Sequence, residues 1–68
     1  MKQISGRDLA RIVQRRGWTI ARISGSHPIF TMPGRRERLS IPVHGNKPLK
    51  TGILRAFMKF AGLEESDL

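Results

Sequence analysis

Two histidines are the residues of this 68-residue chain best suited to proton transfer near neutral pH, because an unperturbed imidazole has a pKa of about 6.5. His27 follows Gly25 and Ser26 in a turn that leads into a predicted strand, and His44 stands where a later predicted strand ends. If those strands form a hairpin with its tip at Pro33-Gly34, both histidines lie at the same end of the sheet. Two imidazoles without adjoining carboxylates suit general acid–base chemistry better than metal binding. The alternative is that each histidine is a surface residue that bounds a turn or loop.

Basic residues dominate the charge of the chain: thirteen Lys and Arg face five Asp and Glu, for a net charge of +8. Nine of the thirteen are arginine, whose planar guanidinium can contact a phosphate at two points. Three arginines recur one helical turn apart near the N-terminus, with Asp8 as their only acidic neighbour. This stripe suits a phosphate backbone or an acidic protein face, and the alternative is a solvated helix face. We expect nucleic acid to contact Arg7, Arg11, Arg15, Arg35, Arg36, Lys47 and Lys50.

The elements that must position these residues can be predicted from turn signals and apolar periodicity. A helix is expected over 6–16, after a Ser5 cap and before Gly17. Strands are expected over 18–23, 27–32 and 38–43, and a second helix over 50–61 that ends at Gly62. Strict alternation in the first strand places Ile20 and Ile23 on opposite faces. The predicted fold class is α+β, a two-layer α-β-β-β-α sandwich with a three-stranded antiparallel sheet and two helices on one face.

Aromatic and apolar residues are expected mainly in the core. Trp18 and the phenylalanines of the second helix fall at core spacing, which leaves Phe30 as the one aromatic side chain available to stack on a base. The apolar arc of the second helix spans on the order of 200°, which is wide for a helix on a sheet. It therefore either covers the sheet deeply or leaves apolar surface for a partner. We expect a protein partner to contact Met58 and Phe60, at the margins of that arc.

Length and composition exclude several classes of protein. A chain of 68 residues can bury one small core, so residues 1–68 are expected to form a single domain without a deep cofactor pocket. Cysteine is absent, and neither a metal motif nor a phosphate-binding loop is present, so no metal and no cofactor are expected. No apolar run approaches the roughly 18 residues that span a membrane. Residues 1–6 lack the apolar core of a secretory signal, so the expected location is cytoplasmic.

In its ordered motifs the chain resembles the HicA toxins, small messenger-RNA interferases of bacterial and archaeal toxin–antitoxin pairs. The segments that carry the resemblance span nearly the whole chain: Arg16-Gly17-Trp18, Arg22-Ile23-Ser24-Gly25-Ser26-His27, Ile41-Pro42-Val43-His44-Gly45, Leu49-Lys50-Thr51-Gly52-Ile53-Leu54-Arg55 and Ala61-Gly62-Leu63. The resemblance implies a double-stranded-RNA-binding-like fold, a catalytic histidine at His27 and a HicB-type antitoxin as partner. Family members often carry a second histidine directly after the first, and here that position is Pro28.

The leading hypothesis is a metal-independent endoribonuclease that cleaves mRNA, inhibits translation and is neutralised by its antitoxin. A metal-free cut through histidine most simply uses the adjacent 2′-OH and leaves a 2′,3′-cyclic phosphate. His27 would act as base or acid, His44 is a weaker candidate for the complementary role, and Ser26 would support His27. DNA would be reached only indirectly, through the antitoxin. Two alternatives are a non-catalytic RNA-binding module of the same fold and a protein-binding module for an acidic partner.

Overall fold

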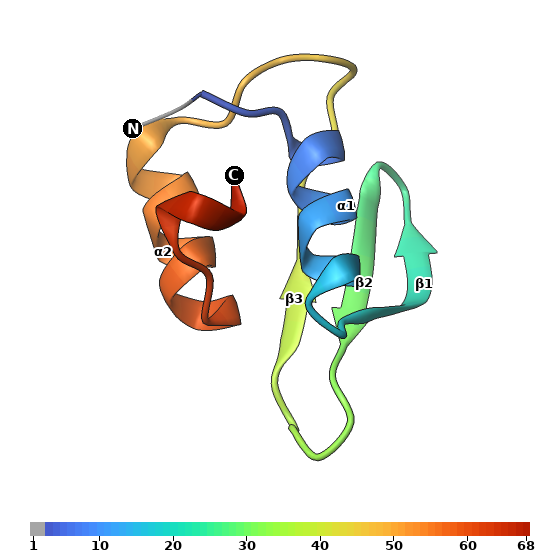
Figure 1. Ribbon diagram of the computed structural model, residues 1–68. Coiled ribbons are helices and arrows are strands. Elements are labelled where there is room, and N and C mark those ends of the chain that lie inside the picture. Colours follow the sequence, from blue (N-terminus) through green and yellow to red (C-terminus); the bar gives the residue numbers. More distant parts are fainter. Residues whose placement is uncertain (1–2) are drawn as a thin grey trace.

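The computed structural model describes residues 3–68 of the chain as a three-stranded sheet with two helices. The elements run in the order α1 Gly6–Arg15, β1 Thr19–Ser24, β2 His27–Thr31, β3 Arg38–Ser40, α2 Thr51–Ala61 and the short 3-10 helix η1 Glu65–Asp67 (Figure 1). Met1 and Lys2, which belong to the segment expected to lack a secretory signal, lie outside the described residues. Within residues 3–68, the structure has no helix with the length and apolar character needed to cross a membrane.

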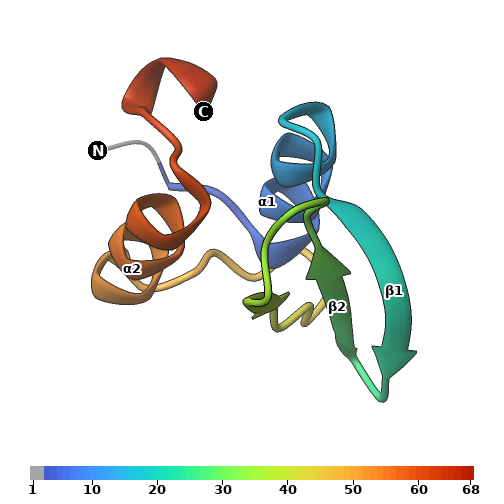
Figure 2. The ribbon, with the colours of Figure 1, turned by 90° about the horizontal axis from the view of Figure 1, so that it is seen from below.

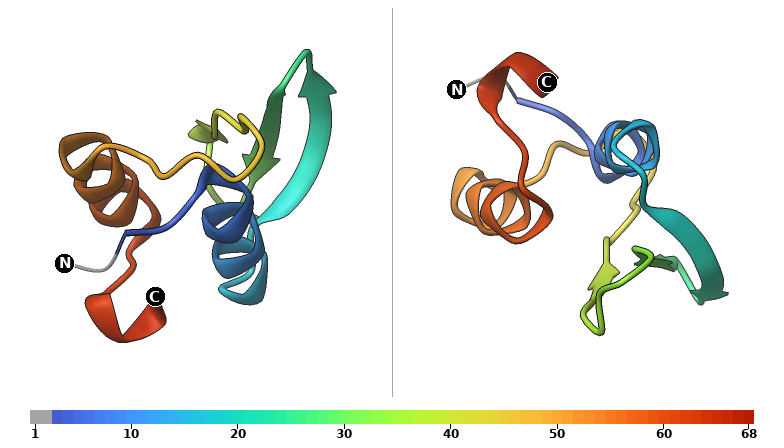
Figure 3. Two further views of the ribbon diagram at one scale, coloured as in Figure 1. Left: turned by 90° about the horizontal axis from the view of Figure 1, so that it is seen from above. Right: turned by 60° about the horizontal axis from the view of Figure 1, so that its bottom comes forward.

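The sheet is antiparallel with the strand order β1-β2-β3, so the predicted α+β class is confirmed. Both helices lie on the same side of this sheet (Figures 2 and 3), as the two-layer prediction required. Helix α2 lies beyond β3, and β1 forms the opposite edge (Figures 1 and 2). The cover is therefore uneven: Phe30 in β2 and Leu39 in β3 are buried, whereas all six residues of β1 are exposed.

Helix α1 begins at Gly6, where the sequence predicts, and ends at Arg15, one residue before the predicted end. The Ser5 hydroxyl accepts a hydrogen bond from the backbone N–H of Asp8 at 3.2 Å, which satisfies one of the free amides of the first turn. Leu9, Ile12 and Val13 are buried on one side of the helix. Gly17 follows with a φ of 103°, a left-handed conformation that glycine adopts at little cost and that stops the helix.

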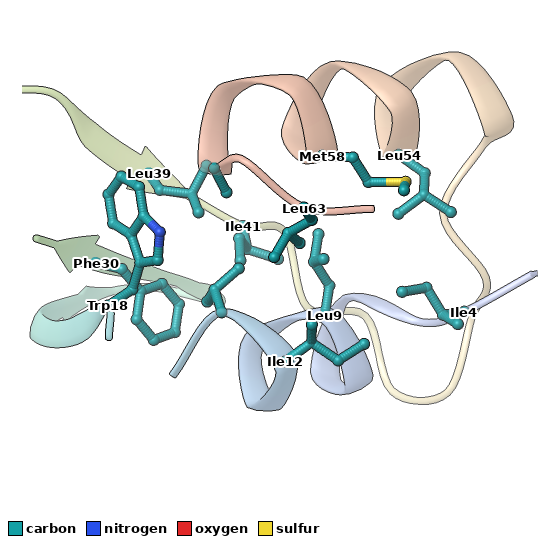
Figure 4. Close-up of a cluster of buried hydrophobic side chains, with 12 residues drawn as sticks. Ile4, Leu9, Ile12, Trp18, Phe30, Leu39, Ile41, Leu54, Met58 and Leu63 are labelled. Atoms are coloured by element: carbon teal, nitrogen blue, oxygen red, sulfur yellow. The ribbon is translucent and has the colours of Figure 1, made fainter. Parts of the chain in front are cut away.

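The core joins both helices to β2 and β3 (Figure 4). Its largest fully buried side chains are Trp18, Phe30, Leu9, Ile41, Leu54 and Val13. The expectation for Phe30 is wrong: its side chain has no exposed surface and cannot stack on a base, because it points from the central strand into the helix layer. Met58 is also buried, at 7% exposure, and is a core residue rather than a residue at the exposed margin of α2. Phe60 remains 37% exposed, as expected for a margin.

The alternation predicted for β1 is interrupted. Ile20 pairs with Phe30 and Ile23 pairs with Pro28, and the register shifts between Ile20 and Arg22. One extra residue in a strand turns the following side chains to the other face. Ile20 and Ile23 therefore share the helix-facing side of the sheet, where strict alternation had placed them on opposite sides.

Strand β3 ends at Ser40, three residues before the predicted end. Pro42 lies in the missing part and Pro28 lies opposite it, and neither residue has an N–H to give to the ladder. Two hydrogen bonds nevertheless keep the chain alongside β2: Ile41 N–H donates to the Pro28 carbonyl at 3.2 Å and Val43 N–H to the Ser26 carbonyl at 3.0 Å. The third strand thus continues as an irregular extension, residues 41–43.

Candidate active site around His27

His27 is held at the end of a tight hairpin between β1 and β2. Ser24 pairs with His27 across the ladder, which leaves Gly25 and Ser26 as the two central turn residues. Gly25 has a φ of 61° and occupies the first central position, where type II′ hairpin turns favour glycine. The turn thereby places an exposed imidazole at the first residue of β2, on a backbone fixed by strand pairing.

His44 lies beside His27, as the hairpin prediction required. The hydrogen bonds of the 41–43 extension reach Ser26 and Pro28, the residues on either side of His27. They bring the two imidazole centroids to 6.0 Å with their planes at 77°. The loop after His44 turns at Gly45, whose φ is 60°, and the Lys47 N–H donates back to the His44 carbonyl at 3.1 Å. The expected proximity of the two histidines is confirmed; their chemical roles stay a prediction.

The start of helix α1 abuts the extension that carries His44. Gly6 approaches the backbone of Pro42 and Val43 so closely that an added Cβ would overlap the Pro42 carbonyl oxygen and lie 3.0 Å from its carbon. Figure 1 shows the beginning of α1 and the β1–β2 turn at the same end of the molecule. Gly6 is therefore a positioning residue that sequence reasoning missed, because a glycine in a first helical turn gives no signal of what it will contact.

The site offers few metal ligands. Among residues 3–68, no three His, Asp or Glu side chains come together in a way that could hold an ion. The titratable groups that the chain places at the turn are two exposed imidazoles, a type of side chain suited to proton transfer.

The arginine stripe Arg7-Arg11-Arg15 is exposed along α1. Asp8 lies 3.9 Å from Arg11, and both side chains are well exposed, so this pair contributes little to stability. Arg7 and Arg15 form no ion pair with another residue in the described part of the chain. The stripe therefore keeps most of its charge available to an external anion.

The other basic residues differ in whether they contact other side chains of the chain. Arg35 lies over two aromatic rings, with its guanidinium carbon 5.1 Å from the centre of Trp18 and 5.5 Å from that of Phe60. Its Nε is also 3.5 Å from the Glu37 carboxylate. Arg35 thus covers the aromatic end of the core, and contact with RNA remains only a prediction for it. The other predicted contacts beyond the stripe are all exposed: Arg36, Lys47 and Lys50.

The fold and the site define a class of protein: a small α+β protein with a strongly basic surface and a histidine pair at one end of its sheet. A family model described as the HicA toxin of bacterial toxin–antitoxin systems matches residues 6–63, and the chain belongs to this family. Among solved structures, one from a HicA3 and HicB3 toxin–antitoxin complex has a TM-score of 0.74 and 29% sequence identity; the match covers 91% of this chain and 98% of that chain. No curated protein matches the chain. The resemblance inferred from the sequence is thereby confirmed, as a toxin family of bacterial toxin–antitoxin pairs.

Proposed function

We propose that the chain is an endoribonuclease that cleaves mRNA, and so inhibits translation in the cytoplasm. The observation that carries the proposal is the histidine pair, 6.0 Å apart at the ring centres and held by backbone hydrogen bonds on both sides of His27. Membership of the HicA toxin family supports a toxic activity. The net charge of +8 and the exposed arginine stripe favour a polyanionic substrate.

The proposed cut is a transfer within the RNA itself. One imidazole removes the proton of a 2′-OH, the 2′-oxygen attacks the adjacent phosphorus, and the bond from phosphorus to the 5′-oxygen breaks. The second imidazole gives its proton to the departing 5′-oxygen, so the products are a 2′,3′-cyclic phosphate and a 5′-OH. His27 is assigned one of these roles and His44 the complementary one, with Ser26 orienting His27 or binding a phosphate oxygen. Arginines stabilise the charge that develops on phosphorus.

The proposed reaction does not depend on a metal ion. Divalent cations at phosphoryl-transfer sites are usually held by carboxylates, and no such group gathers with the two histidines among residues 3–68. The imidazoles supply both proton transfers that the transesterification needs.

We further propose a HicB-type antitoxin as the inhibiting partner. The similar solved chain comes from a complex of HicA3 with HicB3, which supports this assignment. A partner with an acidic face would gain in encounter rate and specificity from the +8 charge of the toxin. Phe60, 37% exposed on α2, offers an apolar contact away from the histidines.

The test is RNA cleavage by the purified chain in excess EDTA. The wild-type chain should shorten RNA, and His27→Ala should not. Ser24→Ala is the matched control, because Ser24 pairs with His27 in the same hairpin and is also exposed. Binding of RNA without cleavage by the wild-type chain would favour the alternative, a non-catalytic RNA-binding module.

A further inference from the structure

The helix-facing side of β1 forms a groove with helix α1 that ends at the His27 turn. The groove has a volume of about 310 Å³ and is lined by Ala10, Gln14, Ile20, Ile23, Gly25, Ser26, Pro28, Phe30 and Val43. Its two aliphatic walls are exposed: Ile20 is 48% and Ile23 is 66% exposed. Apolar side chains gathered at this exposure mark a binding surface.

The β-bulge builds this groove. Without the register shift between Ile20 and Arg22, the two isoleucines would point to opposite sides of the sheet. With the shift, both face α1 and leave one apolar slot between strand and helix.

We propose that the groove binds one unpaired nucleobase of the RNA, next to the phosphate that is cut. Ser26 and Pro28 line the groove and are the chain neighbours of His27. Side chains alternate along a strand, so His27 points to the sheet face opposite the groove. An RNA strand that passes over the end of the hairpin would therefore have its phosphate at His27 and the base of the adjacent nucleotide at the slot. The volume is at the lower end of the roughly 300–1,000 Å³ of small-molecule sites, which suits one planar heterocycle. The inference rests on the proposed ribonuclease function, and it adds a substrate-binding subsite to it.

The polar side chains in the groove could distinguish one nucleobase from another by hydrogen bonding. Gln14 and Ser26 are the lining residues with uncharged polar side chains, and each can both donate and accept a hydrogen bond. Arg7 and Arg11 lie on the same helix as Gln14, at spacings of seven and three residues. Isoleucines would hold the base by its faces, Gln14 would read its edge, and the arginines would hold the phosphates.

The test separates base binding from cleavage. The probe is a set of single-stranded RNA oligonucleotides that carry fluorescent 2-aminopurine at each position in turn. Each probe is titrated into His27→Ala, which is expected to bind without cutting. One position should change its fluorescence, and adding Ile23→Ser to His27→Ala should weaken that binding about tenfold. On the otherwise wild-type chain, Ile23→Ser should lower kcat/KM about tenfold, and Gln14→Ala should flatten the base preference at the same position.

Ile53→Ser is the matched control, because Ile53 is 44% exposed on α2 and does not line the groove. If Ile23→Ser cuts and binds RNA as Ile53→Ser does, the subsite proposal is wrong, even if His27→Ala is inactive. If Ile23→Ser instead loses only its antitoxin, the groove belongs to the protein partner and the proposal is again wrong. If the wild-type chain never cuts RNA but the groove still binds 2-aminopurine, the ribonuclease function fails and the base site stands.

Discussion

Replacing Gly6 by alanine should destabilise the protein and disturb the histidine pair together. The new Cβ would overlap the Pro42 carbonyl oxygen, a backbone atom that cannot rotate away as a side chain can. Overpacking of this kind costs about 1–3 kcal/mol, and the higher helix propensity of alanine offsets up to about 1 kcal/mol. With the full offset, the net loss of up to about 2 kcal/mol corresponds to a fall in Tm of up to roughly 15 °C for a chain of this size.

Activity should fall further than stability alone explains. The displaced residues include Val43, whose N–H donates to the Ser26 carbonyl next to His27. A misplacement of about 1 Å at a reacting centre can cost on the order of 10²-fold in rate, so RNA cleavage by Gly6→Ala should fall at least tenfold well below its Tm. Thermal melts by circular dichroism and cleavage of a fluorescent RNA at a low temperature measure the two effects.

A helical glycine in α2 provides the matched control. Nothing lies within 4 Å of the position that a Cβ on Gly52 would occupy, so Gly52→Ala should raise the stability by up to about 1 kcal/mol and leave cleavage unchanged. The reasoning about Gly6 is refuted if Gly6→Ala melts at or above the wild-type temperature, or if it cleaves RNA at the wild-type rate.

Three further predictions concern charge, the partner and the second histidine. The logarithm of the RNA binding constant should fall with the logarithm of the salt concentration, at a slope of about −0.7 per phosphate contact on single strands. Each single alanine variant of the stripe Arg7, Arg11 and Arg15 should make that slope less steep. A binding constant independent of salt would contradict an electrostatic contribution of the stripe. Phe60→Ser should weaken the antitoxin complex in a binding titration without slowing RNA cleavage by the free toxin. If the isolated Phe60→Ser chain instead unfolds, the contact between Phe60 and Trp18, 6.2 Å between ring centres, is structural. His44→Ala should slow RNA cleavage about 10²-fold or more and leave the thermal melt unchanged. Cleavage at the wild-type rate would exclude His44 as the complementary acid or base.

Local signals in the sequence were enough to predict most of the framework. Ser5, Gly17 and Gly62 act through their own backbone or side chain, and each marks a helix end where the sequence placed one. Turn residues likewise fixed the hairpin that brings His27 beside His44. These features depend on short-range chemistry, which one sequence displays directly.

The remaining features depend on contacts between distant segments. The bulge in β1 turns Ile23 to the helix-facing side of the sheet, and no residue type near Ala21 predicts a bulge at this position. Met58 and Phe60 lie two residues apart on α2, yet only the packed structure shows that the first is in the core and the second is open. Gly6 at Pro42 is the same kind of contact, between residues 36 positions apart, and periodicity cannot predict it.

The most direct test of the proposed chemistry replaces the attacking group in the substrate. An RNA oligonucleotide that the wild-type chain cuts at one position is compared, in EDTA, with the same oligonucleotide carrying a single 2′-deoxy nucleotide just before the cut. The account predicts that the all-RNA strand yields a 2′,3′-cyclic phosphate and a 5′-OH by mass spectrometry, that the 2′-deoxy strand stays intact, and that His27→Ala cuts neither. Cleavage of the 2′-deoxy strand at the same position, or products that carry a 5′-phosphate, would contradict it.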